Sequence, residues 1–496
     1  MNTLAKQTTD RFAPIRALMM TDVYKLGHIQ QYGLAGTPEV VYSNWTNRGS
    51  RIEGVDHVVH FGLQAFLHKL ESWFQPFFTA DEDEVCALYE ERLTQILGPN
   101  TIGSDHIRAL HQKGFLPIMF SAVPEGTKVP LRVPSFVLEN TDSDFYWLTN
   151  YLETVISAEV WQPSTSATLA HELRKVIAAG AERTGADLAG VNWQGHDFSF
   201  RGMSSAETAA ASGAGHLLSF WGTDSLPSLD YIERFYGGGY VAGSVPATEH
   251  SVMCAGSAVL GEKETFSRFI DLYPNGIFSV VSDTFDLWAV LTEFLPEMKD
   301  RIMARDGKMV IRPDSGDPVD ILCGTEIQKN LPSDKGVIEL LWDVFGGTVN
   351  AAGYKELDPH VGAIYGDSIT RERAQQIIDR LEAKGFASSA VVFGVGSFTY
   401  QYNTRDTFMS AVKATWAQVD GVGYDLQKDP ITDGGTKKSA RGRLAVFRND
   451  DSELYLVEEA TPDQEAASEL QPVWMDGQFI RHQTFAEVRE ILNGAA

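Results

Sequence analysis

Cysteine, basic residues and long apolar runs are all scarce in this chain of 496 residues. Its three cysteines, Cys86, Cys254 and Cys323, lie far apart and form no CxxC pair, which argues against a disulfide framework, a zinc site or an iron–sulfur cluster. No apolar run approaches the roughly 20 residues that a membrane-spanning helix needs. The first residues also lack the apolar stretch of a signal peptide. We therefore expect a cytoplasmic protein with no membrane partner.

The shortage of basic residues narrows the classes of ligand. Lys and Arg number 41 against 66 Asp and Glu, which gives a formal net charge of −25. Nucleic-acid backbones are bound by basic surfaces, so a nucleic-acid partner is not expected. An anionic substrate would have to bind in a local basic pocket. The hydrophobic content of 43% is that of an ordinary folded globular protein.

The pattern of apolar runs divides the chain into parts. The length is too great for one simple core. From about Ser164 onward, short apolar runs alternate with helical stretches, as in the βα units of a parallel sheet or barrel. The first 150 residues mix strand and helix signals, and shorter strands and turns follow Arg405. We predict an α/β protein with an irregular parallel α/β barrel over residues 164–400 and an outer α+β domain formed by residues 1–163 and 401–496.

Polar residues and glycines follow four consecutive strand candidates at residues 278–282, 309–311, 361–365 and 390–393. Parallel α/β folds bind ligands at the carboxyl ends of their strands. The alternative is that the Asp and Ser residues only cap the following helices and that the glycines only make turns. That alternative would explain one such ending, but four endings in register favour a ligand site. The residues at these endings are Asp283; Arg312 and Asp314; Gly366 and Asp367; and Gly396 and Ser397.

The segment at residues 195–205 combines aromatic rings, a carboxylate, an imidazole and a guanidinium. Phe198 and Phe200 can offer ring faces to a flat heteroaromatic ligand, and Arg201 can donate to phosphate or pyrophosphate oxygens. A serine before Glu207 can cap a following helix, with Glu207 completing the capping pattern. The alternative is that the two rings belong to the core and that Arg201 is a structural ion-pair partner.

The acidic residues at the strand ends suit two tasks equally well. Asp283, Asp314 and Asp367 could bind the hydroxyl groups of a ribose, or could hold Mg²⁺ against a pyrophosphate. His250 follows Glu249 and is a candidate general base or phosphoryl acceptor, although a lone histidine is more often structural. No HxH pair follows a strand, which argues against a metal-dependent hydrolase barrel.

Six motifs, taken in order, resemble those of the nicotinamide phosphoribosyltransferases. They are residues 21–25, 196–202, 222–224, 244–250, 281–283 and 311–316. The resemblance implies transfer of phosphoribose from phosphoribosyl pyrophosphate to nicotinamide, which gives nicotinamide mononucleotide and pyrophosphate in NAD salvage. It also implies Mg²⁺, ATP as a coupling co-substrate, and a homodimer with two active sites, each of which draws residues from both chains.

The same resemblance implies roles for the residues around the pyridine ring. Phe198 and Tyr24 of the other subunit would sandwich the ring, and Asp224 would accept a hydrogen bond from the carboxamide. Arg201 would lie near the amide oxygen and the pyrophosphate. The resemblance also implies substrate-binding roles for Asp22 and Ser279.

For the sugar and the phosphates, the resemblance implies a larger set. Asp283 and Asp314 would serve the ribose hydroxyls and the Mg²⁺–pyrophosphate, and His250 resembles the histidine that the family phosphorylates with ATP. Arg312 would bind pyrophosphate or ATP phosphates together with Arg48 and Lys428 of the other subunit. The ribose phosphate would be bound by Gly366, Asp367, Gly396 and Ser397, with Arg405 and Lys413 of the other subunit. One departure is Ala411, where a hydroxyl is expected.

Two other functions stay open at this point. A nicotinate phosphoribosyltransferase would have a similar fold, but the carboxylate of Asp224 would repel an acid and stabilise an amide. A non-catalytic nucleotide-binding dimer would be favoured by the loss of Asp283, Asp314 or Arg201, and all three are present.

Overall fold

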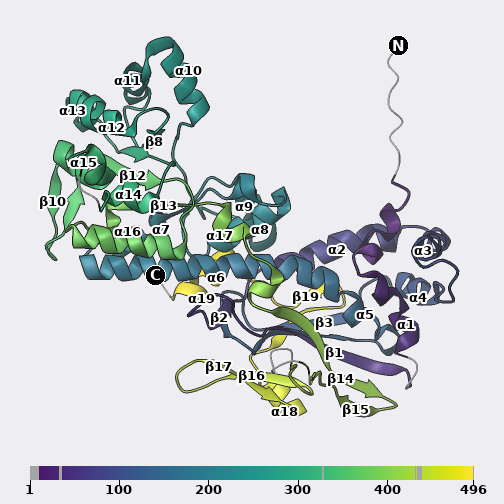
Figure 1. The fold of residues 1–496 in the computed structure, drawn as a ribbon. Helices are drawn as coiled ribbons and strands as arrows, with labels where there is room; N and C mark the ends of the chain where they lie inside the picture. Colours follow the sequence, from purple (N-terminus) through teal and green to yellow (C-terminus); the bar gives the residue numbers. More distant parts are fainter. Residues whose placement is uncertain (1–9, 33–35, 327–328, 431, 433–437, 495–496) are drawn as a thin grey trace, which may run out of the picture. The chain divides into compact units, whose positions relative to one another are not determined.

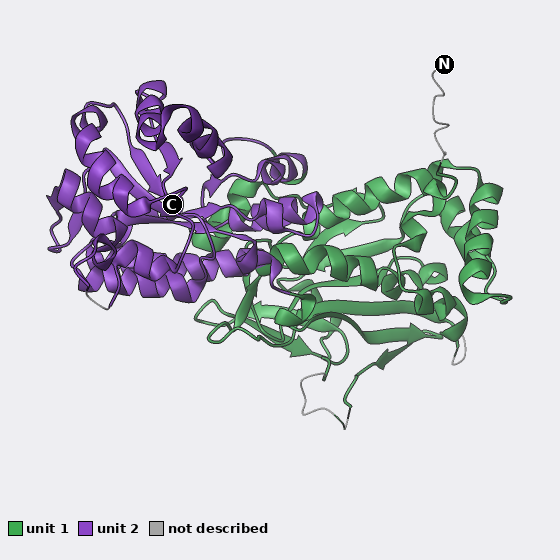
Figure 2. Cartoon of the chain, turned by 45° about the horizontal axis from the view of Figure 1, so that its top comes forward, with its two compact units in different colours: residues 1–165, 235–237, 404–496 green, residues 166–234, 238–403 purple. Residues whose placement is uncertain are grey.

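The computed structural model describes residues 10–32, 36–326, 329–430, 432 and 438–494. The chain divides into two compact units, which Figure 2 colours separately. Unit 1 comprises residues 1–165, 235–237 and 404–496, and unit 2 comprises residues 166–234 and 238–403. The first division falls inside the long helix α6 (Glu153–Thr184). The domain boundaries expected from the sequence stay a prediction beside this division.

A parallel sheet forms the centre of unit 2, with its strands in the order β7-β6-β13-β12-β9-β8. Figure 1 labels three of these strands, β8, β12 and β13. Every neighbouring pair in this sheet is parallel. Most of these strand residues are buried, as expected when helices cover a parallel sheet. The strands are β6 (Gly195–Asp197), β7 (Gly222–Thr223), β8 (Phe278–Val281), β9 (Met309–Arg312), β12 (Val361–Tyr365) and β13 (Val391–Val395).

An irregular segment joins the two edges of this sheet. Gly243 forms a parallel bridge with Gly222 of β7, and Ala247 forms one with Ser279 of β8. The N–H of Ser279 donates to the oxygen of Pro246 at 2.9 Å. Residues 243–247 therefore occupy the gap between the first and last strands, and the sheet curls into an irregular barrel. The predicted α/β class with a parallel barrel is confirmed.

Helices follow the strands of unit 2, as the alternating pattern predicts. In α16, Thr370 caps the N-terminus, and Ala374, Ile377, Ile378 and Leu381 lie buried along one face. The helices of this part of the chain are α7 (Val191–Gln194), α8 (Ala206–His216), α9 (Leu226–Tyr236), α10 (His250–Leu260), α11 (Glu262–Leu272), α12 (Leu287–Ala289), α13 (Leu295–Met303), α14 (Pro318–Cys323), α15 (Gly336–Phe345), α16 (Arg371–Ala383) and α17 (Ser397–Gln401). A short hairpin joins β10 (Gly347–Val349) and β11 (Lys355–Leu357).

Unit 1 is built on an antiparallel sheet with the strand order β15-β14-β1-β5-β3-β18-β19. Trp45 of β1 stacks on Phe136 of β5, and Phe66 of α2 meets Phe120 of β3 edge to face. The apolar face of α2 thus packs against one face of the sheet. The strands are β1 (Pro38–Asn47), β3 (Ile118–Ala122), β5 (Pro134–Asn140), β14 (Ser410–Val419), β15 (Val422–Asp425), β18 (Gln471–Met475) and β19 (Gln478–Phe479).

Besides short 3-10 helices and the start of α6, the described part of unit 1 contains two further strand pairs and seven α-helices. The pairs are β2 (His57–Val59) with β4 (Lys128–Pro130), and β16 (Leu444–Arg448) with β17 (Leu454–Glu458). The helices are α1 (His28–Gln31), α2 (Leu63–Thr79), α3 (Glu82–Leu97), α4 (Asp105–Lys113), α5 (Leu148–Tyr151), α18 (Pro462–Ala466) and α19 (Phe485–Asn493).

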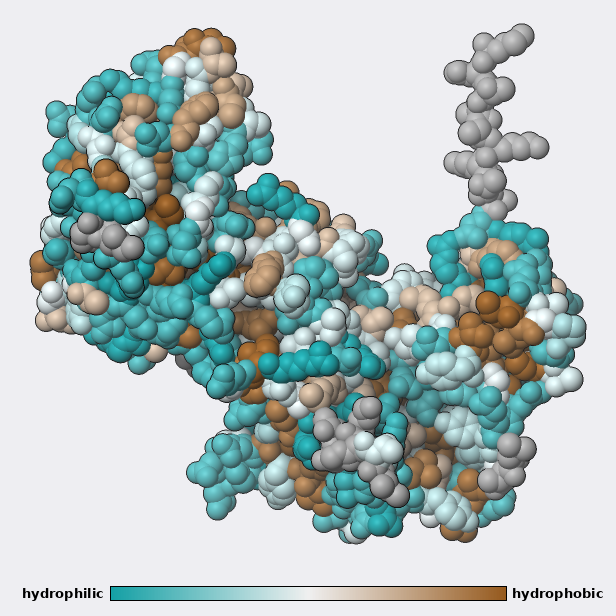
Figure 3. Space-filling view, viewed as in Figure 1, coloured by the Kyte–Doolittle hydropathy of each residue, from teal (hydrophilic) through white to brown (hydrophobic). Residues whose placement is uncertain are grey.

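The visible surface is mostly hydrophilic, as expected of a folded globular protein. Figure 3 shows hydrophilic side chains over much of the visible face, with separate apolar patches between them. In the part of the chain that the structure describes, no helix has both the length and the apolar character to cross a membrane. The three cysteines are free thiols; Cys86 and Cys323 are buried, and Cys254 is exposed.

Candidate active site

The carboxyl ends of the barrel strands in unit 2 surround a cavity of about 500 Å³. Each of the strands β6, β7, β9, β12 and β13 contributes a side chain or a backbone turn within two residues of its end. This is the edge where parallel barrels bind ligands. The residues that line the cavity are Asp197, Phe198, Phe200, Arg201, Gly202, Asp224, Ser225, Ala247, Thr248, Glu249, Arg312, Asp314, Gly366, Asp367, Gly396 and Ser397.

Phe198 and Phe200 form the aromatic wall of the cavity, and two glycines leave room for it. A Cβ atom at Gly394 of β13 would lie 2.7 Å from the ring of Phe198, and one at Gly202 would lie 1.9 Å from Oγ of Ser397. Neither position can accept a side chain without displacing a cavity residue. Phe198 and Phe200 both face the cavity, so a ring face is available where the sequence predicts one.

The helix that follows this wall starts as predicted, with one correction. Ser205 caps α8 by accepting a hydrogen bond from the backbone N–H of Thr208 at 3.2 Å. The reciprocal bond comes from the side chain of Thr208, which accepts from the backbone N–H of Ser205 at 2.9 Å. The expectation that Glu207 completes this pattern is wrong, because Thr208, and not Glu207, is three residues after the cap.

Asp224 lies just beyond β7 and is held by two hydrogen bonds on one oxygen. His196 Nε2 lies 2.9 Å from its Oδ1, and Ser244 Oγ donates to the same atom at 2.5 Å. Burial raises the pKa of Asp224, but the bonds from His196 and Ser244 and the charge of Arg312 outweigh burial, so the net shift is downward. The carboxylate is therefore anionic at neutral pH. Among the described residues, no hydrogen bond reaches its second oxygen, Oδ2.

Three titratable side chains meet at the ends of β8 and β9. Oδ2 of Asp283 accepts hydrogen bonds from the backbone N–H groups of Asp314 and Ser315, both at 2.8 Å. His250 Nε2 lies 3.1 Å from Oδ1 of Asp314, and its Nδ1 lies 3.1 Å from Oγ1 of Thr284. These bonds fix the imidazole ring while leaving 44% of its side chain exposed. A reactive phosphoryl group could therefore reach it.

A cationic side forms opposite these carboxylates. Arg312 Nη2 donates to the backbone oxygen of Thr248 at 2.5 Å, and the guanidinium carbon lies 6.0 Å from the centre of the Phe198 ring. Burial lowers the pKa of Arg312, against the attraction of the nearby aspartates. Its Nε is buried and has no hydrogen-bond partner among the described residues. Arg201 lines the same cavity from an exposed position. Both guanidinium groups suit a polyphosphate.

The residues predicted for the phosphate turn lie together. Gly366 and Asp367 follow β12, and Gly396 and Ser397 follow β13, its parallel neighbour. A Cβ atom at Gly396 would meet only the backbone nitrogen of Ser368, 3.9 Å away, so the turn leaves room for an anion.

A second cavity, of about 450 Å³, adjoins the first in unit 2 and shares Phe198, Asp224 and Arg312 with it. Ser279 lines this second cavity. The Ser279 hydroxyl is buried and has no hydrogen-bond partner among the described residues. Its predicted substrate-binding role stays a prediction.

Asp22 and the five site residues predicted from the other subunit all belong to unit 1. Asp22 and Tyr24 line one surface hollow, and the Tyr24 side chain is 63% exposed. Arg48 and Lys413 line a separate cavity, whereas Arg405 and Lys428 are exposed and line neither. None of the six lines the cavity of unit 2. Their roles stay predictions.

Three residues of the site had no role in the sequence-based prediction. His196 and Ser244 hold Asp224, and Asp197 is fully buried beneath Phe198, where it accepts from the N–H of Ser199 at 2.9 Å. All three lie inside the motifs that carry the resemblance. The motifs therefore contained these residues. The contact of His196 with Asp224, 28 positions later, could not be predicted because it depends on the parallel pairing of β6 with β7.

One group in unit 2 has a donor set that could hold a divalent cation. Ligand atoms of His250, Asp283 and Asp314 all lie within 4.8 Å of one another. Oδ1 of Asp283 is buried and has no hydrogen-bond partner among the described residues, so it can accept a cation. Mg²⁺ prefers carboxylates, water and phosphate oxygens, so the two aspartates fit it better than the imidazole does.

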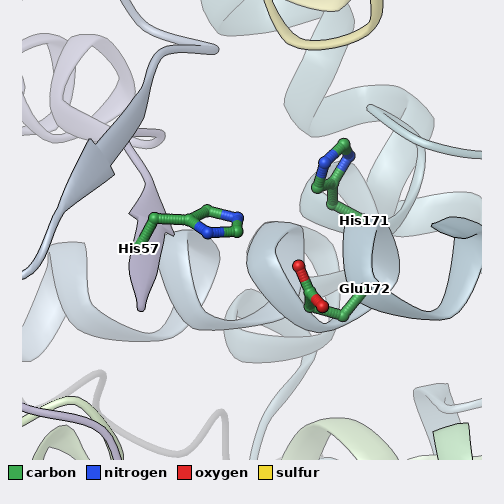
Figure 4. Close-up of side chains that lie close together, drawn as sticks. All are labelled: His57, His171 and Glu172. Atoms are coloured by element: carbon green, nitrogen blue, oxygen red, sulfur yellow. The ribbon is translucent and has the colours of Figure 1, made fainter. Parts of the chain in front are cut away.

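Elsewhere, His57 and Glu172 each have a charged partner of their own. Figure 4 shows His171 and Glu172, consecutive residues of α6 in unit 2. Glu172 accepts hydrogen bonds from Lys175 at 3.0 and 3.2 Å. The third residue drawn, His57 of β2, belongs to unit 1 and has its own acidic partner, Asp56, at 3.0 Å.

The sequence matches one protein family and is similar to curated relatives. The model of the nicotinate phosphoribosyltransferase (NAPRTase) family matches residues 193–478. The nicotinamide phosphoribosyltransferase of Acinetobacter baylyi is 49% identical over 97% of this chain and 97% of its own length. That of Xanthomonas campestris pv. campestris is 35% identical over 95% of this chain and 97% of its own.

Two solved structures share the fold. The nicotinate-nucleotide pyrophosphorylase from Pyrococcus furiosus matches with a TM-score of 0.59 and 14% identity, and it covers 99% of this chain and 97% of its own. Human nicotinic acid phosphoribosyltransferase matches with a TM-score of 0.52 and 17% identity, over 95% and 92% of the two chains. At these identities the likeness concerns the fold alone.

Proposed function

The chain belongs to the nicotinate phosphoribosyltransferase family, and from that premise we propose that it transfers phosphoribose from phosphoribosyl pyrophosphate to nicotinamide. The products are nicotinamide mononucleotide and pyrophosphate, as in NAD salvage. Both relatives named above carry the name of this activity.

The observation that carries this proposal is the environment of Asp224. His196 and Ser244 both bind Oδ1, so Oδ2 is left to accept a hydrogen bond from a ligand. A carboxamide N–H can donate such a bond, whereas the carboxylate of nicotinate would face an anion in a half-buried site. The geometry therefore favours the amide over the acid.

The chemistry needs no side-chain nucleophile directed at the sugar. Transfer at the anomeric carbon passes through an oxocarbenium-like state, which is stabilised by positioning and by charge support of the leaving pyrophosphate. Phe198 would hold the pyridine ring against the anomeric carbon. Arg201 and Arg312 would bind the pyrophosphate, and Asp283 would bind the ribose hydroxyls. The glycine turns after β12 and β13 would bind the ribose phosphate.

Mg²⁺ belongs to the proposal as a cofactor. Asp283 and Asp314 would hold it, directly or through water, and it would neutralise charge on the pyrophosphate as that group departs. Oδ1 of Asp283 supports this assignment, because it is buried and has no hydrogen-bond partner among the described residues.

ATP as a coupling co-substrate also belongs to the proposal. His250 would accept the phosphoryl group of ATP. Its ring is oriented by Asp314 and Thr284, yet its side chain is 44% exposed. Such a step would improve coupling without being required for basal transfer.

We also propose a cytoplasmic homodimer. In it, Tyr24, Arg48, Arg405, Lys413 and Lys428 of each chain would serve the active site of the other. Asp22 would also bind substrate. The exposure of Tyr24 and the cationic cavity around Lys413 support this part.

The test is a direct assay of the purified protein with phosphoribosyl pyrophosphate, Mg²⁺ and either nicotinamide or nicotinate, with and without ATP. We expect nicotinamide mononucleotide, in larger yield when ATP is present. A faster reaction with nicotinate would keep the fold and overturn the specificity. The absence of any product would favour a non-catalytic nucleotide-binding dimer.

A further inference from the structure

A cationic cavity of about 190 Å³ lies in unit 1, away from the barrel. Four basic side chains line it, Arg48, Arg132, Lys413 and Lys438, with a single carboxylate, Glu458. In a chain with a net charge of −25, this is a local excess of positive charge of the kind that binds anions.

The floor of the cavity is one face of the antiparallel sheet. Asn44 and Thr46 of β1 stand opposite Lys413 and Ala411 of β14, and all four side chains line the cavity. Ala411 contributes no hydrogen-bond donor to this floor. Burial lowers the pKa of Lys413, Glu153 opposes that shift, and the charge of Arg48 adds to it. The cavity is therefore electropositive.

Arg132 enters this cavity from a turn that suits glycine better than arginine. The N–H of Val133 donates to the oxygen of Pro130 at 3.2 Å, which closes a turn with Arg132 in its third position. The φ of Arg132 is +71°, whereas Leu131 has no positive φ, and these signs of φ are those of a type II turn. Glycine or asparagine is favoured at that position because a side chain is strained there.

Nothing else in the described residues accounts for an arginine at this position. Its backbone N–H donates to the oxygen of Asn47 at 2.7 Å, which places it beside Arg48. That bond would form with any residue except proline. The side chain is exposed, and the described residues offer it no hydrogen bond or ion pair. Residues held at strained dihedrals without structural need are found at functional sites.

We propose that Arg132 is a phosphate-binding residue, which completes with Arg48 and Lys413 a site for a phosphate group of phosphoribosyl pyrophosphate. This inference rests on the proposed function for the identity of the ligand. In this proposal Arg132 binds an anion and does not stabilise the turn.

The test compares Arg132→Gly with the full-length wild type in two measurements. Glycine removes the cation and also the strain, so the KM for phosphoribosyl pyrophosphate should rise roughly tenfold, while the melting temperature should rise by about 1 °C. Arg132→Lys should keep part of the affinity. Ser452→Gly, at another residue with positive φ (+64°), is the matched control: it should gain stability with no change in KM.

Each other result overturns the proposal. An unchanged KM, or a lower melting temperature for Arg132→Gly, would make Arg132 a structural residue. A rise in the KM for ATP alone would assign the cavity to ATP phosphates. If the wild type has no transferase activity, the proposed function fails by itself. Pyrophosphate titrated into both proteins then decides, since equal affinity would remove Arg132 from anion binding.

Discussion

Asp224 presents one occupied and one open oxygen to the cavity, and this asymmetry leads to a prediction about substrate choice. In Asp224→Asn the negative charge disappears, so repulsion of nicotinate should disappear with it. We expect kcat/KM for nicotinamide to fall about tenfold, the value of a hydrogen bond to a charged group. We expect the preference for nicotinamide over nicotinate to narrow. Parallel steady-state assays with the two substrates measure both effects.

Ser244→Ala is the matched control for this prediction. It removes one hydrogen bond to Oδ1 and keeps the charge of Asp224. The preference for the amide should then persist, with a smaller loss of activity. If Asp224→Asn discriminates against nicotinate as strongly as the wild type does, charge at Asp224 does not set the specificity.

A substitution at His250 should separate basal phosphoribosyl transfer from its stimulation by ATP. His250→Ala removes the proposed phosphoryl acceptor but leaves the carboxylate–amide contacts of Asp283 intact. We expect basal transfer to remain within about threefold of wild type, and the stimulation by ATP to be lost. The assay is product formation with and without ATP, alongside Thr284→Val, which removes only the hydroxyl beside Nδ1. Equal stimulation by ATP in His250→Ala and wild type would exclude this role.

At the scale of the element, strand β13 lies so close to Phe198 that adding a methyl group at Gly394 should displace the ring. In Gly394→Ala the new Cβ would lie 2.7 Å from the Phe198 ring and 2.6 Å from the backbone oxygen of Tyr365. Because moving the ring would leave the contact with the Tyr365 oxygen in place, both the ring and the backbone of β13 must shift. We expect kcat/KM for nicotinamide to fall roughly 10- to 100-fold, as misplaced substrates react slowly. Kinetics and the melting temperature should be measured together.

Gly362→Ala, on the adjacent strand β12, is the control. Its Cβ would meet only the flexible side chain of Lys308, 3.2 Å away. This variant should keep nearly full activity. Similar losses in the two variants would mean that any methyl group in the sheet disturbs the barrel.

The strands of the barrel could be predicted because their signal is local. Runs of apolar residues followed by Asp, Arg or Gly mark β8, β9, β12 and β13, and each lies within two residues of its predicted bounds. Hydrophobic patterning fixes such short buried strands, since covering helices require apolar side chains on both faces. The resemblance supplied the remaining site residues of unit 2.

What the sequence did not predict depends on contacts between distant residues. Residues 243–247 close the barrel by isolated bridges, without a regular strand pattern. Residues 235–237 join unit 1, although their neighbours on both sides belong to unit 2. The strained turn at Arg132 carries no glycine to mark it. None of these features has a periodic pattern, so local reasoning does not find them.

At the scale of the whole molecule, each of the two units buries histidines that must stay neutral. Burial lowers the pKa of His60 to about 3 and of His106 to about 4 in unit 1, and of His216 to about 4 in unit 2. His216 is bonded as a neutral ring, with Nδ1 lying 2.6 Å from the hydroxyl of Tyr400 and Nε2 3.2 Å from the oxygen of Gly222. A proton on Nδ1 would disrupt the first of these bonds.

The sign of the pH effect follows from these shifts. An unfolded histidine has a pKa of about 6.5, so between pH 6.5 and pH 4 the unfolded chain binds more protons than the folded one. The free energy of unfolding should therefore fall as the pH drops through this range, by about 2 kcal/mol at pH 5 for a histidine such as His216. Melting temperatures measured from pH 7 to pH 5 should decline. His216→Gln, which can keep both a donor and an acceptor, should flatten that decline for unit 2, whereas the exposed His482→Gln should not. A melting temperature that stays constant down to pH 5 would mean that these histidines are not buried as neutral groups.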